Sequence, residues 1–180
     1  MKMQKISFIE DKNFLSKKSI NFIETVVLGN NFPFFLNTNA VSGDNNNFMS
    51  HIVLKRIEER KNKNEINSSF YINFIDILNE FTKKNNITYK EVFRISVNFS
   101  YNNNSKCSPI HVDHEFSHRQ LLVYLNTVED AFTVIYNKSK NKILKKINPE
   151  KYKGVCFNSF PHVGFFPKKG ERIVIVYTFK

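Results

Sequence analysis

The stretch Ser108-Pro109-Ile110-His111-Val112-Asp113 is the most informative part of this chain. It lies in a region of short apolar runs, and residues i and i+2 of a β-strand point to the same face. His111 and Asp113 would therefore present an imidazole and a carboxylate side by side. His162 is the only histidine in the C-terminal half of the strand-rich region and is the natural third ligand. Two imidazoles and one carboxylate can hold an iron(II) ion and leave its opposite face open.

A second arrangement of histidines has to be weighed against this one. His114 and His118 have the i, i+4 spacing of a helical zinc pair. The apolar runs on both sides favour strands over a helix, and no cysteine or further histidine is placed to complete such a site. We therefore expect His114, His118 and His51 to be solvent-facing or hydrogen-bonded structural histidines.

Arg172 stands at the start of Ile173-Val174-Ile175-Val176-Tyr177, the most apolar predicted strand. A charge in that position is uncommon unless it is paired. A guanidinium matches a carboxylate through two hydrogen bonds, so Arg172 could bind the far carboxylate of a dicarboxylate such as 2-oxoglutarate. An arginine that only reaches solvent is the alternative. Tyr124, in Leu121–Asn126, is either a second contact to that carboxylate or an ordinary core tyrosine.

The composition is that of a globular domain. The chain has 180 residues, of which 41% are hydrophobic, which is enough for one domain with a core. No apolar run approaches the roughly eighteen residues of a membrane span, and the beginning lacks the pattern of a signal peptide. Cys107 and Cys156 make a poor disulfide framework. We expect a cytoplasmic location, which would be the host cytoplasm for a viral protein.

Helical patterns precede strand patterns along the chain. We expect one domain over residues 1–180, with a helical part over about 1–90 and a strand-rich core over about 91–180 that forms an antiparallel sandwich or barrel. This is an α+β fold, mainly β, with a helical buttress. A helix should begin near Ser16, Ser68–Asn85 has regular helical spacing, Phe32–Leu36 predicts a buried strand and residues 38–47 a loop. Further predicted strands are Val92–Tyr101, Arg119–Leu125, Phe132–Tyr136, Gly154–Phe157 and Arg172–Phe179.

The formal net charge of +11 has two interpretations. It permits attraction to nucleic acid, anionic lipid or acidic protein. The lysines are scattered rather than gathered in one stripe, and an AT-rich genome favours codons for Lys, Asn, Ile and Phe, all abundant here. The charge is therefore either functional or only compositional.

From about Arg94 to Phe179 the chain resembles the prolyl-hydroxylase-like branch of the 2-oxoglutarate/Fe(II)-dependent dioxygenases. Small, Asn- and Lys-rich members of this family also occur in phages and other viruses. One departure is Val128–Phe132, which stands where members often carry a glycine pair. The matching pieces, in order, are His111-Val112-Asp113, Tyr124-Leu125-Asn126, Gly154-Val155-Cys156-Phe157 leading to His162, and Gly170-Glu171-Arg172-Ile173-Val174-Ile175.

The resemblance implies a double-stranded β-helix, or jelly roll, with iron between its two sheets. It implies Fe(II) and the co-substrate 2-oxoglutarate, with ascorbate as an accessory reductant. The iron ligands, which are also the catalytic residues, would be His111, Asp113 and His162. The distal carboxylate of 2-oxoglutarate would be met by Arg172 and Tyr124, with Tyr101 or Asn98 as a further polar contact.

The activity so implied is a dioxygenase that couples oxidative decarboxylation of 2-oxoglutarate to succinate with hydroxylation of a substrate. The Tyr124-Leu125-Asn126 strand favours a protein or peptide substrate. Alternatives are an oxygenase or demethylase directed at nucleic acid, in keeping with the net charge, and a basic metal-binding jelly roll without oxygenase activity. The sequence does not name the substrate.

Overall fold

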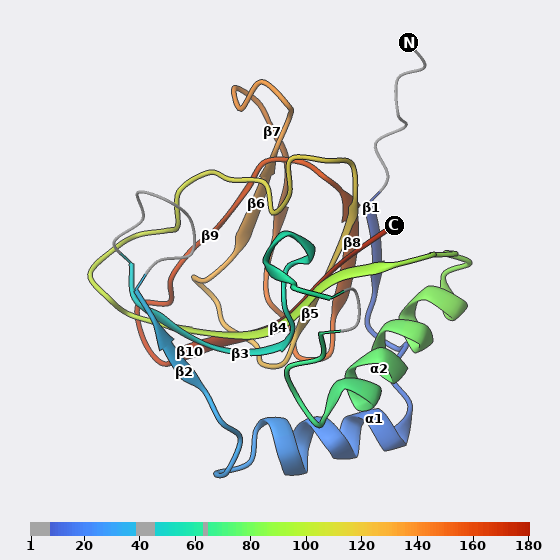
Figure 1. The fold of residues 1–180 in the computed structure, drawn as a ribbon. Coiled ribbons are helices and arrows are strands. Elements are labelled where there is room, and N and C mark those ends of the chain that lie inside the picture. Colours follow the sequence, from blue (N-terminus) through green and yellow to red (C-terminus); the bar gives the residue numbers. More distant parts are fainter. Residues whose placement is uncertain (1–7, 39–45, 63–64) are drawn as a thin grey trace.

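Two antiparallel β-sheets form the body of the protein in a computed structural model, which describes residues 8–38, 46–62 and 65–180 (Figure 1). The larger sheet has the strand order β1-β8-β5-β10-β4-β3-β2, and the smaller sheet has the order β7-β6-β9. The strands are β1 (Phe8–Asp11), β2 (Phe35–Asn37), β3 (Phe48–Leu54), β4 (Val92–Tyr101), β5 (Arg119–Tyr124), β6 (Thr133–Tyr136), β7 (Ile143–Ile147), β8 (Gly154–Asn158), β9 (His162–Gly164) and β10 (Glu171–Phe179).

Alternation of side chains gives the larger sheet two different faces. Along β10, Ile173, Ile175 and Tyr177 belong to one apolar core, whereas Val174 and Val176 belong to a second. The first core is shared with the helices and the second with the smaller sheet. Because the side-chain period of a strand is two, every second residue of β4, β5 and β10 faces the space between the two sheets.

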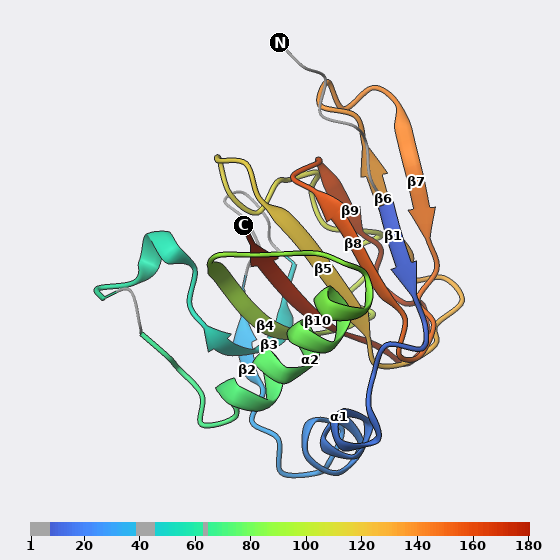
Figure 2. The ribbon, with the colours of Figure 1, turned by 90° about the vertical axis from the view of Figure 1, so that its right-hand side faces the viewer.

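The helices cover the face of the larger sheet that is turned away from the smaller sheet (Figure 2). Helix α1 (Lys17–Phe22) begins at Ser16, whose side chain accepts a hydrogen bond from Ser19 N, and it continues as a π-helical turn over Ile23–Val27. Helix α2 (Tyr71–Lys84) is amphipathic, with its apolar stripe buried against the sheet. The fully buried members of that stripe are Phe74, Ile77, Leu78 and Phe81.

The sequence predicted the α+β class, the capping by Ser16 and the regular helix correctly. Most of the predicted strands agree closely with β4, β5, β6, β8 and β10. The patterns missed β1, β3, β7 and β9, which are short or lack clean alternation. The predicted buried strand Phe32–Leu36 is wrong in detail, since β2 begins only at Phe35 and leaves Phe35 and Leu36 exposed. Its position as the last strand of the sheet explains this exposure.

Two further expectations concern segments outside the sheets. The predicted loop over residues 38–47 falls for the most part outside the described residues. No helix in the described part of the chain is both long and apolar enough to cross a bilayer.

Candidate metal centre

His111, Asp113 and His162 meet in the space between the two sheets. One ligand-type atom from each of the three side chains lies within 4.8 Å of the other two. The backbone itself brings the histidines together, because His111 and His162 form an isolated antiparallel bridge with N–H···O distances of 3.1 and 2.9 Å. Their ring centroids are 4.5 Å apart. His111 and Asp113 lie in the loop before β5, and His162 is the first residue of β9. The fold thus brings together three predicted side chains from distant parts of the sequence.

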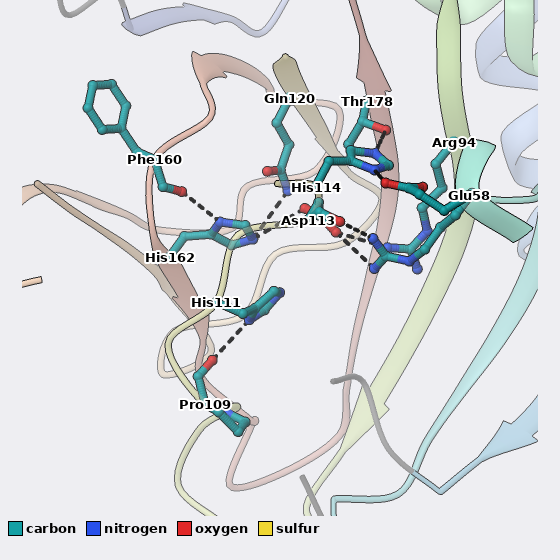
Figure 3. Close-up of polar contacts among 11 residues, drawn as sticks. Glu58, Arg94, Pro109, His111, Asp113, His114, Gln120, Phe160, His162 and Thr178 are labelled. Atoms are coloured by element: carbon teal, nitrogen blue, oxygen red, sulfur yellow. Dashed lines mark hydrogen bonds and ion pairs between the residues drawn. The ribbon is translucent and has the colours of Figure 1, made fainter. Parts of the chain in front are cut away.

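Main-chain carbonyls fix the orientation of both imidazoles (Figure 3). His111 Nδ1 lies 2.9 Å from Pro109 O, and His162 Nδ1 lies 3.1 Å from Phe160 O. A carbonyl oxygen only accepts hydrogen bonds, so in the neutral rings each Nδ1 carries the proton. The Nε2 atoms of both rings then carry lone pairs, as the Nε2 ligands of a metal ion require. That of His162 accepts a hydrogen bond from Gln120 Nε2 at 3.3 Å.

Two arginines hold the carboxylate of Asp113. Asp113 Oδ1 accepts hydrogen bonds from Arg94 Nη1 at 3.0 Å and from Arg56 Nη2 at 3.1 Å, and Arg56 Nη1 also donates to Asp113 O. Burial raises the pKa of Asp113, but the neighbouring imidazole and guanidinium groups outweigh it and place the pKa well below its ordinary value. The carboxylate is therefore ionised, and Oδ2 has no hydrogen-bond partner among the described residues.

The third member of the cluster is neutral at physiological pH. Burial, followed by the nearby His111 ring, lowers the pKa of His162 to about 4. His162 Nε2 lies 3.6 Å from Asp113 Oδ2 and 3.3 Å from Gln120 Nε2 (Figure 3). Gln120 Oε1 has no partner in the described part of the chain. Asp113 and Gln120 thus both approach His162 Nε2, and each has one unpaired side-chain oxygen.

A cavity of about 110 Å³ lies beside these groups and reaches Arg172. Aliphatic side chains of β5 and β10 form part of its wall. At the far end Arg172 Nη2 donates a hydrogen bond to Thr133 Oγ1 at 3.0 Å, while Arg172 Nε has no partner among the residues described. The guanidinium also lies over the ring of Tyr124, 5.3 Å from its centroid. The cavity thus joins the metal-ligand cluster to a buried cation.

The other three residues predicted for this end of the cavity, Tyr124, Asn98 and Tyr101, differ in their positions relative to it. Tyr124 is fully buried, and its hydroxyl lies 2.9 Å from Thr133 Oγ1, so it is linked to Arg172 through Thr133. Asn98 lines the cavity, and its Oδ1 is unpaired within the described residues. Tyr101 is not among the lining residues. Three positions beyond Asn98 on β4, it points to the opposite face of the sheet.

The remaining histidines are hydrogen-bonded and buried rather than solvent-facing. His51 contacts Pro33 O and Ser68 Oγ, each at 2.8 Å. His114 contacts Glu58 and Thr178 through its two ring nitrogens, and His118 Nδ1 lies 2.9 Å from Phe116 O. Residues 111–118 contain no helix, so the spacing of His114 and His118 does not place them as a helical zinc pair.

Sequence reasoning missed four residues of the site: Arg56, Arg94, Gln120 and Thr133. One signal was available, because Arg94 interrupts a predicted apolar strand in the way that Arg172 does. Arg56 lies just before a 3-10 turn over Ile57–Glu59, and its approach to Asp113 depends entirely on tertiary structure. The site residues on β4 and β5 follow from strand alternation once the inward face is known.

The residues present fit a divalent metal ion. A buried, ionised carboxylate oxygen without a partner is costly unless something pairs with it. Two imidazoles whose Nε2 atoms carry lone pairs beside it complete the donor set of a facial 2-His-1-carboxylate site. The cavity with Arg172 at its far end likewise fits a small dicarboxylate.

Comparison with solved structures supports the expected fold. A 2OG-Fe(II) oxygenase family oxidoreductase from Burkholderia pseudomallei aligns with a TM-score of 0.73 and 14% identity, over 96% of this chain and 84% of that one. A Trichoplax adhaerens prolyl hydroxylase, in complex with a hypoxia inducible factor peptide fragment, aligns with a TM-score of 0.60 and 16% identity, over 96% of this chain and 82% of that one. A Pseudomonas putida prolyl-4-hydroxylase aligns with a TM-score of 0.58 and 11% identity, over 98% of this chain and 94% of that one. The predicted jelly-roll fold of the 2-oxoglutarate oxygenases is confirmed.

By sequence, no protein-family model and no curated protein matches the chain. At these identities the likeness establishes the fold. The chemistry has to be argued from the site itself.

Proposed function

We propose that this protein is a 2-oxoglutarate- and Fe(II)-dependent oxygenase. The observation that carries the proposal is the cavity that begins at His111, Asp113 and His162 and ends at Arg172. Its two ends match the two ends of a keto-dicarboxylate bound beside a metal ion. The fold that the chain shares with 2OG-Fe(II) oxygenases supports this proposal.

Each residue has a separable task in this proposal. The Nε2 atoms of His111 and His162 and Oδ2 of Asp113 would hold Fe(II), and Arg56 and Arg94 keep the carboxylate ionised and oriented. Arg172, positioned by Thr133, would bind the distal carboxylate of 2-oxoglutarate. When bound, iron and 2-oxoglutarate supply the oxidation chemistry, in which 2-oxoglutarate is converted to succinate and carbon dioxide and the substrate is hydroxylated.

A protein or peptide substrate is supported by one comparison. The Trichoplax prolyl hydroxylase was solved with a peptide fragment bound, and the fold of that enzyme covers nearly all of this chain. A substrate in nucleic acid is the second candidate, and the net charge of +11 favours it. Salt-dependent binding of DNA or RNA that persists without metal would support the second candidate over the first.

The activity can be tested before the substrate is known. We expect purified protein supplied with Fe(II), 2-oxoglutarate, ascorbate and oxygen to form succinate slowly without a second substrate, and His111→Ala to abolish this turnover. His51→Gln serves as the control, because His51 is also a buried, hydrogen-bonded histidine but lies outside the cavity. Metal and 2-oxoglutarate binding without succinate formation would indicate a jelly-roll protein that lacks oxygenase activity.

A further inference from the structure

The cavity carries more positive charge than its metal-ligand role requires. Among the described residues, three arginines line it, namely Arg56, Arg94 and Arg172, against a single carboxylate, that of Asp113. Arg172 is at one end of the cavity, and the other two guanidiniums share one oxygen of Asp113 at the opposite end. Binding of a divalent metal and a 2-oxoglutarate dianion would leave this excess unchanged, because their charges cancel.

Arg94 has donors beside the cavity that Asp113 does not use. A guanidinium has five N–H donors, yet among the described residues the only hydrogen bond from Arg94 is the one from Nη1 to Asp113 Oδ1. Its side chain is only 10% exposed and lines the cavity, so its remaining donors lie in a confined space. Such a buried, incompletely paired cation is costly. The arrangement is understandable if a second anion is present when the protein works.

Nearby acidic side chains do not supply that anion. Glu58 is hydrogen-bonded to His114 Nδ1. Glu59 attracts Arg94 electrostatically, but it is exposed and is not among the residues that line the cavity. Holding Asp113 Oδ1 would need only one guanidinium, which Arg56 already provides while also binding Asp113 O. The second guanidinium is thus in excess of the positioning task.

We propose that Arg94 and Arg56 form a subsite for an anionic group, a carboxylate or a phosphate, on the part of the substrate that enters the cavity. This inference rests on the proposed function, because it assigns the substrate class of the same site. Arg94 lies at the buried end and Arg56, 21% exposed, lies nearer solvent. An anion bridging them would pair with N–H groups that Asp113 leaves free and would lie beside the metal ligands.

The test is direct binding of small anions to the metal-loaded protein. Protein carrying one equivalent of Mn(II) and saturated with 2-oxoglutarate under nitrogen is titrated calorimetrically, at constant ionic strength, with sodium acetate, sodium methylphosphonate and the neutral acetamide. We expect saturable binding of acetate or methylphosphonate and none of acetamide. The anion that binds identifies the carboxylate or the phosphate class. Arg94→Gln and Arg56→Gln should each weaken this binding by about tenfold or more.

Arg119→Gln is the matched control, since it removes the same charge from an exposed residue outside the cavity, and it should bind the anion as the wild type does. Mn(II) stoichiometry and thermal unfolding verify that each variant is folded and loaded. Arg56→Gln tests the inference even if Arg94→Gln fails to fold. Anion binding that is equal in all variants, or absent from the wild type, would overturn the inference, as would binding that occurs only without 2-oxoglutarate.

The same titration separates this inference from the proposed function. Failure of 2-oxoglutarate to bind the Mn(II)-loaded protein would count against the oxygenase, and the anion titration can then be repeated on the protein with metal alone. Tight 2-oxoglutarate binding with no binding of the small anions would instead refute only the proposed substrate class.

Discussion

Arg172 Nη2 and Thr133 Oγ1 are joined by a hydrogen bond of 3.0 Å inside the protein. Thr133 is 1% exposed and also contacts the hydroxyl of Tyr124 at 2.9 Å. A threonine of the smaller sheet thus fixes an arginine of the larger sheet. Because Arg172 is anchored by a neutral group, its charge stays available to an anionic ligand.

Replacing Arg172 by Ala should weaken 2-oxoglutarate binding without removing the metal ligands. Loss of one partner of a buried charge pair costs about 2–5 kcal/mol, which raises the dissociation constant roughly 30-fold or more. Calorimetric titration of the Mn(II)-loaded variant under nitrogen measures this. Arg172→Lys keeps the charge but loses the planar fork and should be intermediate. An unchanged dissociation constant would refute the role of Arg172.

Thr133→Val should disturb the same end of the cavity, because Thr133 positions Arg172 there. The substitution keeps the shape but removes the oxygen that Arg172 and Tyr124 both contact. Leaving a buried polar group unpaired costs about 1–3 kcal/mol, so both the free energy of unfolding and 2-oxoglutarate affinity should fall. Denaturant unfolding and calorimetry measure the two effects. Tyr124→Phe removes only one contact and should have the smaller effect on affinity.

Asp113→Ala and His111→Ala should each abolish specific metal binding. A ligand present at about 100 times its dissociation constant stabilises a folded protein by about 2.7 kcal/mol. We expect Mn(II) to raise the unfolding temperature of the wild type and of His51→Gln, but not of the two site variants. A full Mn(II)-dependent shift in Asp113→Ala would show that the metal binds elsewhere.

Gly154→Ala should destabilise the protein strongly, because β8 passes directly over two phenylalanine rings. A Cβ atom at Gly154 would lie 2.7 Å from Phe81 Cδ2 and 2.8 Å from Phe14 Cε1. Overpacking of this kind costs about 1–3 kcal/mol. Adding Phe81→Leu to Gly154→Ala should recover part of the loss, and urea unfolding of the double-mutant cycle tests the coupling. Strictly additive effects would mean that the two residues do not clash.

Stability should fall as the pH drops below about 6.5, in part through His51. Burial lowers the pKa of His51 below its ordinary value of 6.5. The unfolded chain then binds a proton that the folded protein does not, so the free energy of unfolding decreases with falling pH until the folded-state pKa is reached. His118 and His162 act in the same direction.

Comparing His51→Gln with the wild type at pH 7.5 and 5.5 isolates the contribution of His51, because glutamine does not titrate. The variant should lose less stability between the two pH values. Equal losses would show that His51 is not responsible for any of the pH dependence.

Prediction from sequence worked where local pattern and final environment agree. Helix α2 follows from its apolar spacing, and β4 and β10 follow from β-rich runs that become central strands. It was weaker at the edges, as β2 shows, because a short apolar run does not reveal whether anything will cover it. The sequence could not show which of Tyr101 and Asn98 lines the cavity, because the inward face of β4 was not known.

By itself, the sequence indicated which side chains could form a metal site. His111 and Asp113 are two positions apart and His162 is the only histidine after His118, and these features predicted the three groups that the structure brings together. The expected strand over His111–Asp113 is wrong in detail, because these residues form a loop with one isolated bridge to His162. Only the tertiary structure decided the charge around them. Arg56 and Arg94 lie 38 positions apart, on a turn and a strand that no local pattern relates, yet both donate to Asp113 Oδ1. Long-range contacts of this kind depend on how strands pair and sheets pack, which the periodicity of any one segment does not encode.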